Sequence, residues 1–254
     1  MNIIARFFLN LLRFFLSFLF VLSLSSFIIV WTLADFSQKS NIKPLMTEVI
    51  YQELNRQIDA YSEEQLKRYI STLCANKENV ETTISGIDLK FSCKDFFVAN
   101  DLKKFFAESI AESFYEASYS CEVIECLNEE RYDVLVSRKG NEFYNQAFLP
   151  LITASALSGL ATFALEEGKI SKRVRAIAVL IFLVCLPAIA INFLKEPIKQ
   201  RFISYSEVVD KIVENLLAIA FKKYLLAFIF GISLLAISIF LWLVERRQNI
   251  KQVV

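Results

Sequence analysis

The stretch FFLSFLFVLSLSSFIIVWTL, residues 14–33, decides the fold because it contains twenty consecutive residues without a charge. A helix rises about 1.5 Å per residue, so this run can cross a hydrocarbon core of about 30 Å. Its apolar core is longer than that of a cleaved signal peptide, so we expect it to be retained. Residues 1–13 are amphipathic and are expected to lie in the membrane interface or to lengthen this helix.

Three further runs have no charge and a similar length, and they cover residues 147–165, 176–194 and 224–244. Together with residues 14–33 they predict four transmembrane helices. The chain as a whole is 55% hydrophobic, which is too apolar for a soluble domain of 254 residues. We therefore expect an all-α membrane protein that spans the cell membrane several times.

The basic residues predict the orientation of these helices. Two precede the first run, four lie in the 166–175 loop and three follow the last run, which makes nine, against six in residues 195–223. The positive-inside rule then places both termini and the 166–175 loop in the cytoplasm. Residues 35–146 are expected outside, and they hold 13 basic and 20 acidic residues, a net charge of −7.

Residues 35–146 predict a small, mainly helical domain with one β-hairpin. Apolar residues at helical spacing indicate helices over 44–61, with Pro44 at the first helical position, over 62–74, and over 101–119, capped by Asn100 or Asp101. Alternation of apolar and polar residues over 79–93 predicts the hairpin, and YDVLVS, 132–137, suggests a short strand. The doublets Phe96-Phe97 and Phe105-Phe106 are expected to fill the core.

Four of the five cysteines fall in this outer domain: Cys74, Cys93, Cys121 and Cys126. An oxidising compartment favours disulfides in a small domain, and four cysteines permit three pairings. We favour Cys74 with Cys93 and Cys121 with Cys126. A zinc site is disfavoured because the two separations are 18 and 4 intervening residues, against the C-x(2–4)-C pairs that structural zinc sites usually combine, and the chain has no histidine.

Four expected spans combined with outer cysteines resemble the general plan of the disulfide-generating quinone reductases of the DsbB and vitamin K epoxide reductase families. Those families carry a C-x-x-C pair at the membrane boundary, whereas four residues separate Cys121 from Cys126. The resemblance implies a quinone-linked thiol-disulfide oxidoreductase as one alternative function. The topology also resembles that of gap-junction-like and claudin-like four-span proteins, which implies an oligomeric channel or pore as another.

Few features of the sequence indicate catalysis, phosphate binding or ion-coupled transport. Without histidine, Ser-His and Cys-His nucleophiles are excluded, and the chain carries no glycine-rich phosphate-binding motif. No Asp, Glu, Lys or Arg lies deep in a predicted span, which disfavours ion-coupled transport. We expect no enzyme activity, no cofactor, no metal, no nucleic-acid partner and no small-molecule substrate.

Two sets of residues are predicted to make contacts. Small side chains at four-residue spacing favour close helix packing in the second span, and they are Ala154, Ser155, Ser158, Gly159 and Thr162. An apolar stripe between the third and fourth spans forms a predicted interaction surface, and it consists of Tyr205, Val208, Val209, Ile212, Val213, Leu216 and Ile219.

These observations predict five parts along the chain. Residues 1–34 hold the interfacial segment and first span, 35–146 the disulfide-stapled outer domain, 147–194 two spans with a basic cytoplasmic loop, 195–223 an outer amphipathic helix, and 224–254 the last span with a basic tail. The expected function is non-enzymatic: the outer domain contacts another membrane or surface protein, or further copies of the chain in a homo-oligomer.

Overall fold

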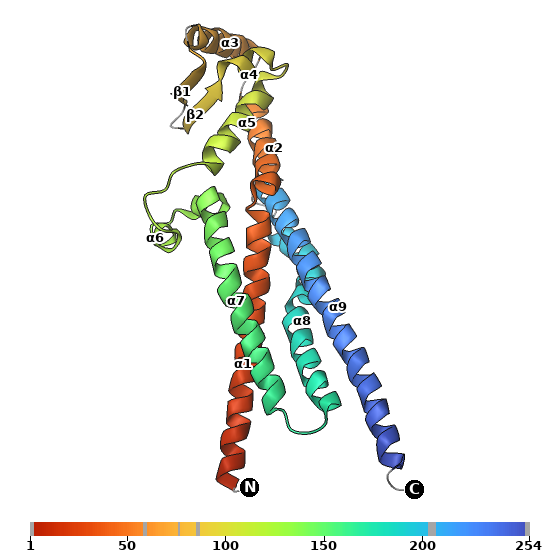
Figure 1. Ribbon diagram of the computed structural model, residues 1–254. Coiled ribbons are helices and arrows are strands. Elements are labelled where there is room, and N and C mark those ends of the chain that lie inside the picture. Colours follow the sequence, from red (N-terminus) through yellow and green to blue (C-terminus); the bar gives the residue numbers. More distant parts are fainter. Residues whose placement is uncertain (1–2, 58–59, 76, 85–86, 203–206, 252–254) are drawn as a thin grey trace. The chain divides into compact units, whose positions relative to one another are not determined.

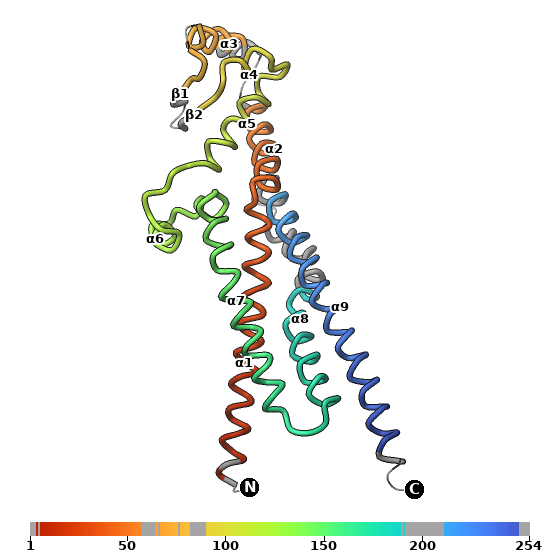
Figure 2. The backbone as a smooth tube through the Cα atoms, viewed as in Figure 1, coloured from red at the N-terminus to blue at the C-terminus, as the bar shows by residue number. Residues whose placement is uncertain are grey.

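The structure is a computed structural model that describes residues 3–57, 60–75, 77–84, 87–202 and 207–251 (Figures 1 and 2). The elements along the chain are α1 (Ile3–Phe36), α2 (Lys39–Gln57), α3 (Ala60–Cys74), β1 (Asn79–Ile84), β2 (Ile87–Ser92), α4 (Cys93–Val98), α5 (Leu102–Tyr115), α6 (Val123–Asn128), the 3-10 helix η1 (Tyr132–Val136), α7 (Arg138–Leu165), α8 (Ile170–Phe202) and α9 (Glu207–Lys251).

The chain divides into two compact units. One consists of Met1–Leu33 and Tyr144–Val254 and is called the span unit below. The other is Ala34–Phe143, which contains both cysteine pairs and is called the disulfide unit.

Three described helices are long and apolar enough to cross a membrane, with their candidate spans at Arg6–Phe36, Arg138–Leu165 and Lys211–Gln248. They contain three of the four predicted runs. The remaining run, 176–194, falls in α8, whose side chains are described only in part. It stays a prediction.

The helices of the span unit pack through aromatic and small side chains. The rings of Phe27 on α1 and Phe148 on α7 lie 4.9 Å apart, centroid to centroid. A Cβ atom at Gly159 would come within 2.9 Å of the Phe20 ring, so the absence of a side chain there lets α1 approach α7. In the same unit, α8 and α9 run side by side (Figure 1). The rings of Phe182 on α8 and Phe228 on α9 are in edge-to-face contact, with their centroids 5.1 Å apart.

The disulfide unit is built around the predicted hairpin. β1 and β2 pair antiparallel from Asn79 opposite Ser92 to Ile84 opposite Ile87. The Asp101 side chain accepts a hydrogen bond from the Lys104 backbone N–H at 3.0 Å and caps α5, so the cap is Asp101 and not Asn100, the other predicted candidate. Buried side chains from α3, the hairpin, α4 and α5 meet in one core: Ile70, Cys74, Val80, Phe91, Cys93, Phe96, Leu102 and Phe106.

Three local predictions for this unit are wrong. α2 begins at Lys39, five residues before Pro44, because the carbonyl of Gln38 already accepts the backbone N–H of Ile42 at 2.9 Å. α5 ends at Tyr115 and not at residue 119, with Glu116 as its C-cap. The expected strand 132–137 is instead η1, whose Val134 packs into a cluster with Cys121 and Cys126. The short helices α4 and α6 were not predicted.

Candidate functional site

The disulfide between Cys74 and Cys93 holds α4 against the core of the disulfide unit. The two sulfur atoms lie 2.06 Å apart and join the last residue of α3 to the first residue of α4. Within α4, Phe96 is 2% exposed and lies in edge-to-face contact with Phe105 at 5.8 Å. Both ends of this short helix are thereby fixed, one by a covalent bond and one by aromatic packing.

The same helix presents two apolar side chains to solvent. Phe97 is 63% exposed and Val98 is 74% exposed, and we call this pair the α4 edge. A shallow groove of about 470 Å³ begins at Val98 and is lined further along by Asp101, Lys104 and Glu108. An apolar pair held on a rigid helix beside a charged groove has the composition of a protein-binding patch.

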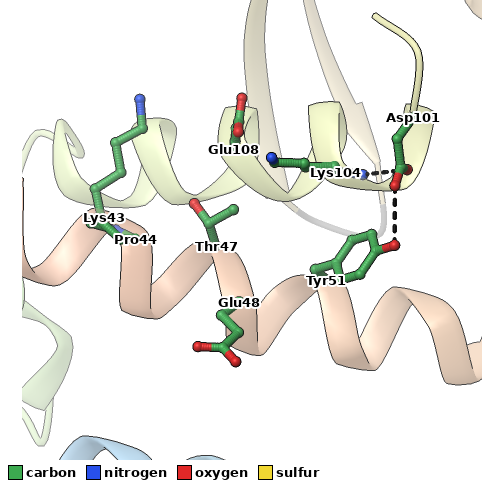
Figure 3. Close-up of a pocket in the computed structure, with 8 residues that line it drawn as sticks. All are labelled: Lys43, Pro44, Thr47, Glu48, Tyr51, Asp101, Lys104 and Glu108. Carbon is green, nitrogen blue, oxygen red and sulfur yellow. Dashed lines mark hydrogen bonds between the residues drawn. The ribbon is translucent and has the colours of Figure 1, made fainter. Parts of the chain in front are cut away.

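A second groove runs between α2 and α5 and has a volume of about 700 Å³ (Figure 3). Its lining residues are Lys43, Pro44, Thr47, Glu48, Tyr51, Asp101, Lys104 and Glu108. Figure 3 shows Thr47 pointing toward α5 and Glu48 pointing away from it. The Tyr51 hydroxyl donates to Asp101 Oδ2 at 3.0 Å, while Asp101 Oδ1 caps the helix. Both carboxylate oxygens of Asp101 therefore already accept hydrogen bonds from within the protein.

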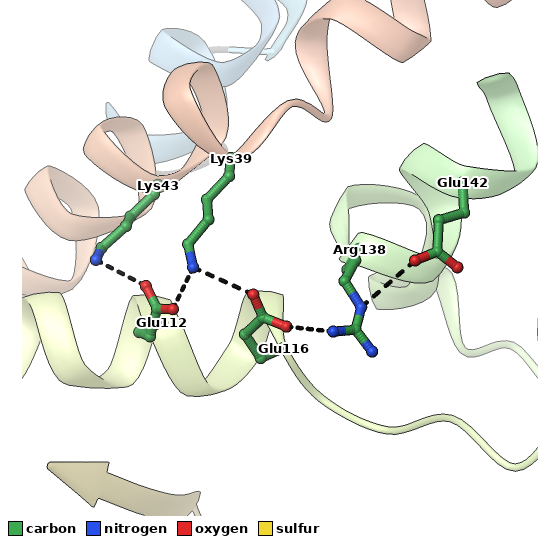
Figure 4. A network of polar contacts seen from close by, with 6 residues as sticks. All are labelled: Lys39, Lys43, Glu112, Glu116, Arg138 and Glu142. Atoms are coloured by element: carbon green, nitrogen blue, oxygen red, sulfur yellow. Dashed lines mark hydrogen bonds and ion pairs between the residues drawn. The ribbon is translucent and has the colours of Figure 1, made fainter.

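Ion pairs fasten α2 to α5 beside this groove (Figure 4). Lys39 Nζ donates to Glu112 and, at 3.1 Å, to Glu116 Oε1, and Lys43 Nζ lies 2.7 Å from Glu112 Oε2. Arg138, in the first turn of α7, donates from Nη1 to Glu116 Oε2 at 2.9 Å. Each carboxylate thus contacts two basic groups, and the network draws together residues almost a hundred positions apart.

The charges in this network shift one another's protonation. Hydrogen bonding to Glu112 raises the pKa of Lys39 above 10.5. Desolvation pushes the pKa of Glu112 upward, but the hydrogen bonds from Lys39 and Lys43 outweigh it, so the pKa falls below 4.5. The backbone N–H of Lys104 likewise lowers the pKa of Asp101. All three shifts keep these groups charged at neutral pH, as in a structural network.

Cys121 and Cys126 form the second disulfide, with Cα atoms 5.4 Å apart. Both residues are buried in a small cluster with Tyr119, Val123 and Val134. The ammonium group of Lys139 donates to the Cys121 carbonyl at 2.8 Å and so fixes the loop from outside. Burial of both cysteines keeps a thiolate or a quinone from the sulfur atoms, which favours a structural staple over redox turnover.

Desolvation, followed by the hydrogen bond to Asp133, raises the pKa of Tyr119. The hydroxyl of Tyr119 donates to Asp133 Oδ2 at 2.9 Å and stays protonated at neutral pH. Among the residues that the structure describes, no three His, Cys, Asp or Glu side chains gather in a way that could hold a metal ion.

No family model matches this chain. No curated protein and no solved structure matches it either.

The residues predicted to pack α7 do not all share one face. Ser155, Ser158 and Thr162 are buried, and Gly159 lies against Phe20, whereas Ala154 is exposed. The buried hydroxyls bond carbonyls one turn back on α7, for example Thr162 Oγ1 to the Ser158 carbonyl at 2.8 Å. Hydroxyl groups that bond the carbonyls of their own helix do not line a polar pore along α7.

The predicted interaction surface is only partly described. Tyr205 lies outside the described residues, as do the side chains of Val208 and Val209. In α9 the side chain of Val213 is exposed, and three residues of the stripe are half-buried: Ile212, Leu216 and Ile219.

The α4 edge was missed from the sequence. Both phenylalanine doublets predicted core, which is right for Phe96 and Phe106 and wrong for Phe97. The available signal was the number of residues between Cys93 and Asp101: a helix that short can bury only one side, so one member of the Phe96-Phe97 pair has to face outward.

Proposed function

We propose that this chain is a four-span membrane protein that is not an enzyme, and that its disulfide unit lies outside the cytoplasm and binds another protein through the α4 edge. The observation that carries the proposal is the exposed Phe97-Val98 pair on a helix that a disulfide holds at one end and a buried aromatic ring at the other. Rigid aromatic anchors of this kind supply most of the binding energy in protein interfaces because little conformational entropy is lost when they dock.

The arrangement of the span unit supports the proposed topology. The N-terminal end of α1, the turn between α7 and α8, and the C-terminal end of α9 lie at one end of this unit (Figure 1). Basic residues gather in all three places, including Arg13, Lys172 and Arg246. The positive-inside rule assigns this end to the cytoplasm.

The two disulfides support an outer location for Ala34–Phe143. Disulfides persist in oxidising compartments and are rare in the cytosol. The single cysteine without a disulfide, among the described residues, is Cys185, which is buried in the span unit.

The other two candidate functions gain no support from a specific contact. A pore would need polar groups directed into a path, yet the hydroxyls of α7 that are buried bond the carbonyls of their own helix. A thiol oxidoreductase would need access to Cys121 and Cys126, and both are buried. The α9 stripe, of which Val213 is exposed, is proposed as a second contact surface.

Photo-crosslinking in whole cells tests the proposed binding surface. A photoreactive amino acid at Phe97 should form one adduct of defined mass with another protein, and the Val98→Asp substitution should abolish that adduct. The matched control is the same probe at Ile124, which is 62% exposed on α6 of the same unit. Adducts of equal yield at both positions, or none at Phe97, would contradict the proposal.

Thiol labelling of intact cells tests the proposed location independently. A membrane-impermeant thiol reagent should label the chain only after reduction, and then on four cysteines. Labelling that requires permeabilised cells would place the disulfide unit on the other side of the membrane.

A further inference from the structure

The two grooves of the disulfide unit meet along α5. The groove beside the α4 edge begins at Val98, and the groove between α2 and α5 reaches Thr47 on α2. Three residues of α5 line both grooves: Asp101, Lys104 and Glu108. We call these three residues the α5 stripe. A chain segment that lies on the stripe would therefore contact both grooves at once.

The α5 stripe lies on one exposed face of its helix. Its members follow one another at steps of three and four residues, which places them on the same side, and all three are exposed. The stripe is about 10 Å long at ~1.5 Å per residue. That length matches a few residues of an extended peptide, each of which spans about 3.3 Å.

Only two of the charged groups that line the groove between α2 and α5 remain without an intramolecular partner. Asp101 accepts two hydrogen bonds, Lys43 pairs with Glu112, and Glu48 points away from α5 (Figure 3). Lys104 and Glu108, by contrast, form no side-chain hydrogen bond or ion pair within the described part of the chain.

Lys104 and Glu108 do not neutralise each other either. They are four residues apart on α5, but a lysine that precedes a glutamate is the weaker order for an ion pair on a helix. A binding partner can therefore pair with both groups without first breaking an ion pair of this unit.

The surface around the stripe is already fixed. Lys43 Nζ lies 2.7 Å from Glu112 Oε2 and joins α2 to α5. The disulfide of Cys93 holds α4, and Thr47 points toward α5 from the opposite wall of the groove (Figure 3). A partner that binds such a surface loses little free energy to the ordering of this chain.

From these observations we infer that the partner of the α4 edge binds through a short peptide segment that lies along the α5 stripe. The segment places an apolar side chain on Phe97 and Val98, an acidic side chain on Lys104 and a basic side chain on Glu108. The apolar contact supplies most of the binding energy, and the two opposite charges fix the direction and register of the segment. This inference rests on the proposed function and adds the chemistry of the partner.

Photo-crosslinking from both ends of this surface tests the inference on the full chain in whole cells. One variant carries a photoreactive amino acid at Phe97 and another carries it at Thr47. Both adducts should contain the same protein, with attachment points within about ten residues of each other, because the stripe is short relative to an extended chain of about 3.3 Å per residue. That segment should contain an apolar, an acidic and a basic residue in this order, read in either chain direction. The control probe at Asn55, which is exposed on α2 and lines neither groove, should give no such adduct.

Charge reversal at Lys104 tests the predicted acidic contact. Lys104→Glu should lower the yield of both adducts about tenfold, because it sets a carboxylate against the acidic side chain of the partner. Lys67→Glu is the matched control: Lys67 is exposed on α3 and lines neither groove, and its reversal changes the net charge by the same amount. It should leave both yields unchanged.

The outcomes separate this inference from the proposed function. One shared segment of the expected composition, with yields that fall only in Lys104→Glu, supports the inference. An adduct at Phe97 without one at Thr47, capture of a second copy of this chain at Thr47, attachment points far apart in the partner, a segment without an acidic residue, or equal yields in the two charge-reversal variants would each overturn the inference alone. The absence of an adduct at Phe97 would refute the proposed function, and the inference with it.

Discussion

In the span unit many large apolar side chains face outward and several hydroxyl groups are buried, whereas in the disulfide unit phenylalanines form the core and most charges lie outside. Phe18, Leu157 and Phe240 are exposed in the first unit, while Ser155, Ser158 and Ser238 are buried. In the second unit, Phe91, Phe96 and Phe106 form the core. The two units therefore differ in how many of their large apolar side chains face outward.

The proposed membrane insertion would place the two units in different solvents. Lipid would supply no hydrophobic drive for helix association, so the span unit would depend on close packing such as that at Gly159 and Phe20. Water does supply that drive, and the disulfide unit uses it through its aromatic core. Mutations should therefore act through different mechanisms in the two units.

The largest effect is expected at the aromatic core. Phe96→Ala should destabilise the disulfide unit by about 3–5 kcal/mol because it removes a buried ring and leaves a cavity. Hydrogen exchange of the β1 and β2 amides, measured by mass spectrometry on the full chain, should accelerate accordingly.

Phe97→Ala is the matched control for this change. The Phe97 side chain is mostly exposed, so its loss should change stability by less than about 0.5 kcal/mol. Similar acceleration in the two variants would show that α4 is not packed as described.

Removal of the disulfides ranks next. Cys74 and Cys93 close a loop with a sequence separation of 19, against 5 for Cys121 and Cys126. The chain-entropy model then gives losses of about 3 and about 2 kcal/mol for the two double alanine variants. Urea unfolding, followed by near-ultraviolet circular dichroism, measures both. Equal or reversed losses would mean that loop length does not govern these two bonds.

A smaller effect is expected in the span unit. Gly159→Leu should destabilise the contact between α1 and α7 by about 1–3 kcal/mol, because even a Cβ atom would come within 2.9 Å of the Phe20 ring. Fluorescence of Trp31, which packs near Phe27 and Phe148, reports this contact during detergent titration in a Trp242→Phe background.

Ala156→Leu is the control because Ala156 lies on the exposed side of the same helix. It should leave the Trp31 signal unchanged, since a larger apolar side chain facing lipid costs little. If both leucine variants shift the transition equally, the packed face of α7 has been wrongly assigned.

Much of the fold could be predicted because the governing signals are local. Uncharged runs gave the three described candidate spans, and alternation over residues 79–93 gave the hairpin. Of the two predicted caps, Asn100 and Asp101, Asp101 accepts the hydrogen bond from the Lys104 backbone N–H. Each of these features depends on residues that are near neighbours in the chain.

The features that could not be predicted depend on contacts between distant residues. YDVLV has the composition of a strand, but no described strand pairs with it, and Val134 packs instead against the Cys121–Cys126 loop as part of η1. The ion pairs from Lys39 and Lys43 to Glu112 join residues about seventy positions apart in the sequence, and no local spacing pattern predicts them. The exposure of Phe97 likewise follows from how α4 sits on the core.

The smallest expected effect concerns pH and separates the two units again. The folded-state pKa of Glu112 is lowered, so its contribution to stability is present above its ordinary value of 4.5 and is lost as the pH falls through the folded-state pKa. The pKa of Lys39 is raised, so its contribution is present below 10.5 and is lost as the pH rises through the folded-state pKa. Stability of the disulfide unit should therefore be greatest between these limits.

Glu112→Gln should lower that plateau by no more than about 1 kcal/mol, since the side chains in the pair are about one-third or more exposed and solvent screens them. The free energy of unfolding should also fall less steeply at acidic pH in this variant. Some of this acidic pH dependence should remain, because the pKa of Asp101 is lowered as well. Glu81→Gln, which breaks an exposed pair with Lys90 across the hairpin, is the control and should change neither. Urea unfolding at a series of pH values measures both variants. An unchanged plateau and acid limb in Glu112→Gln would mean that apolar packing alone holds α2 against α5.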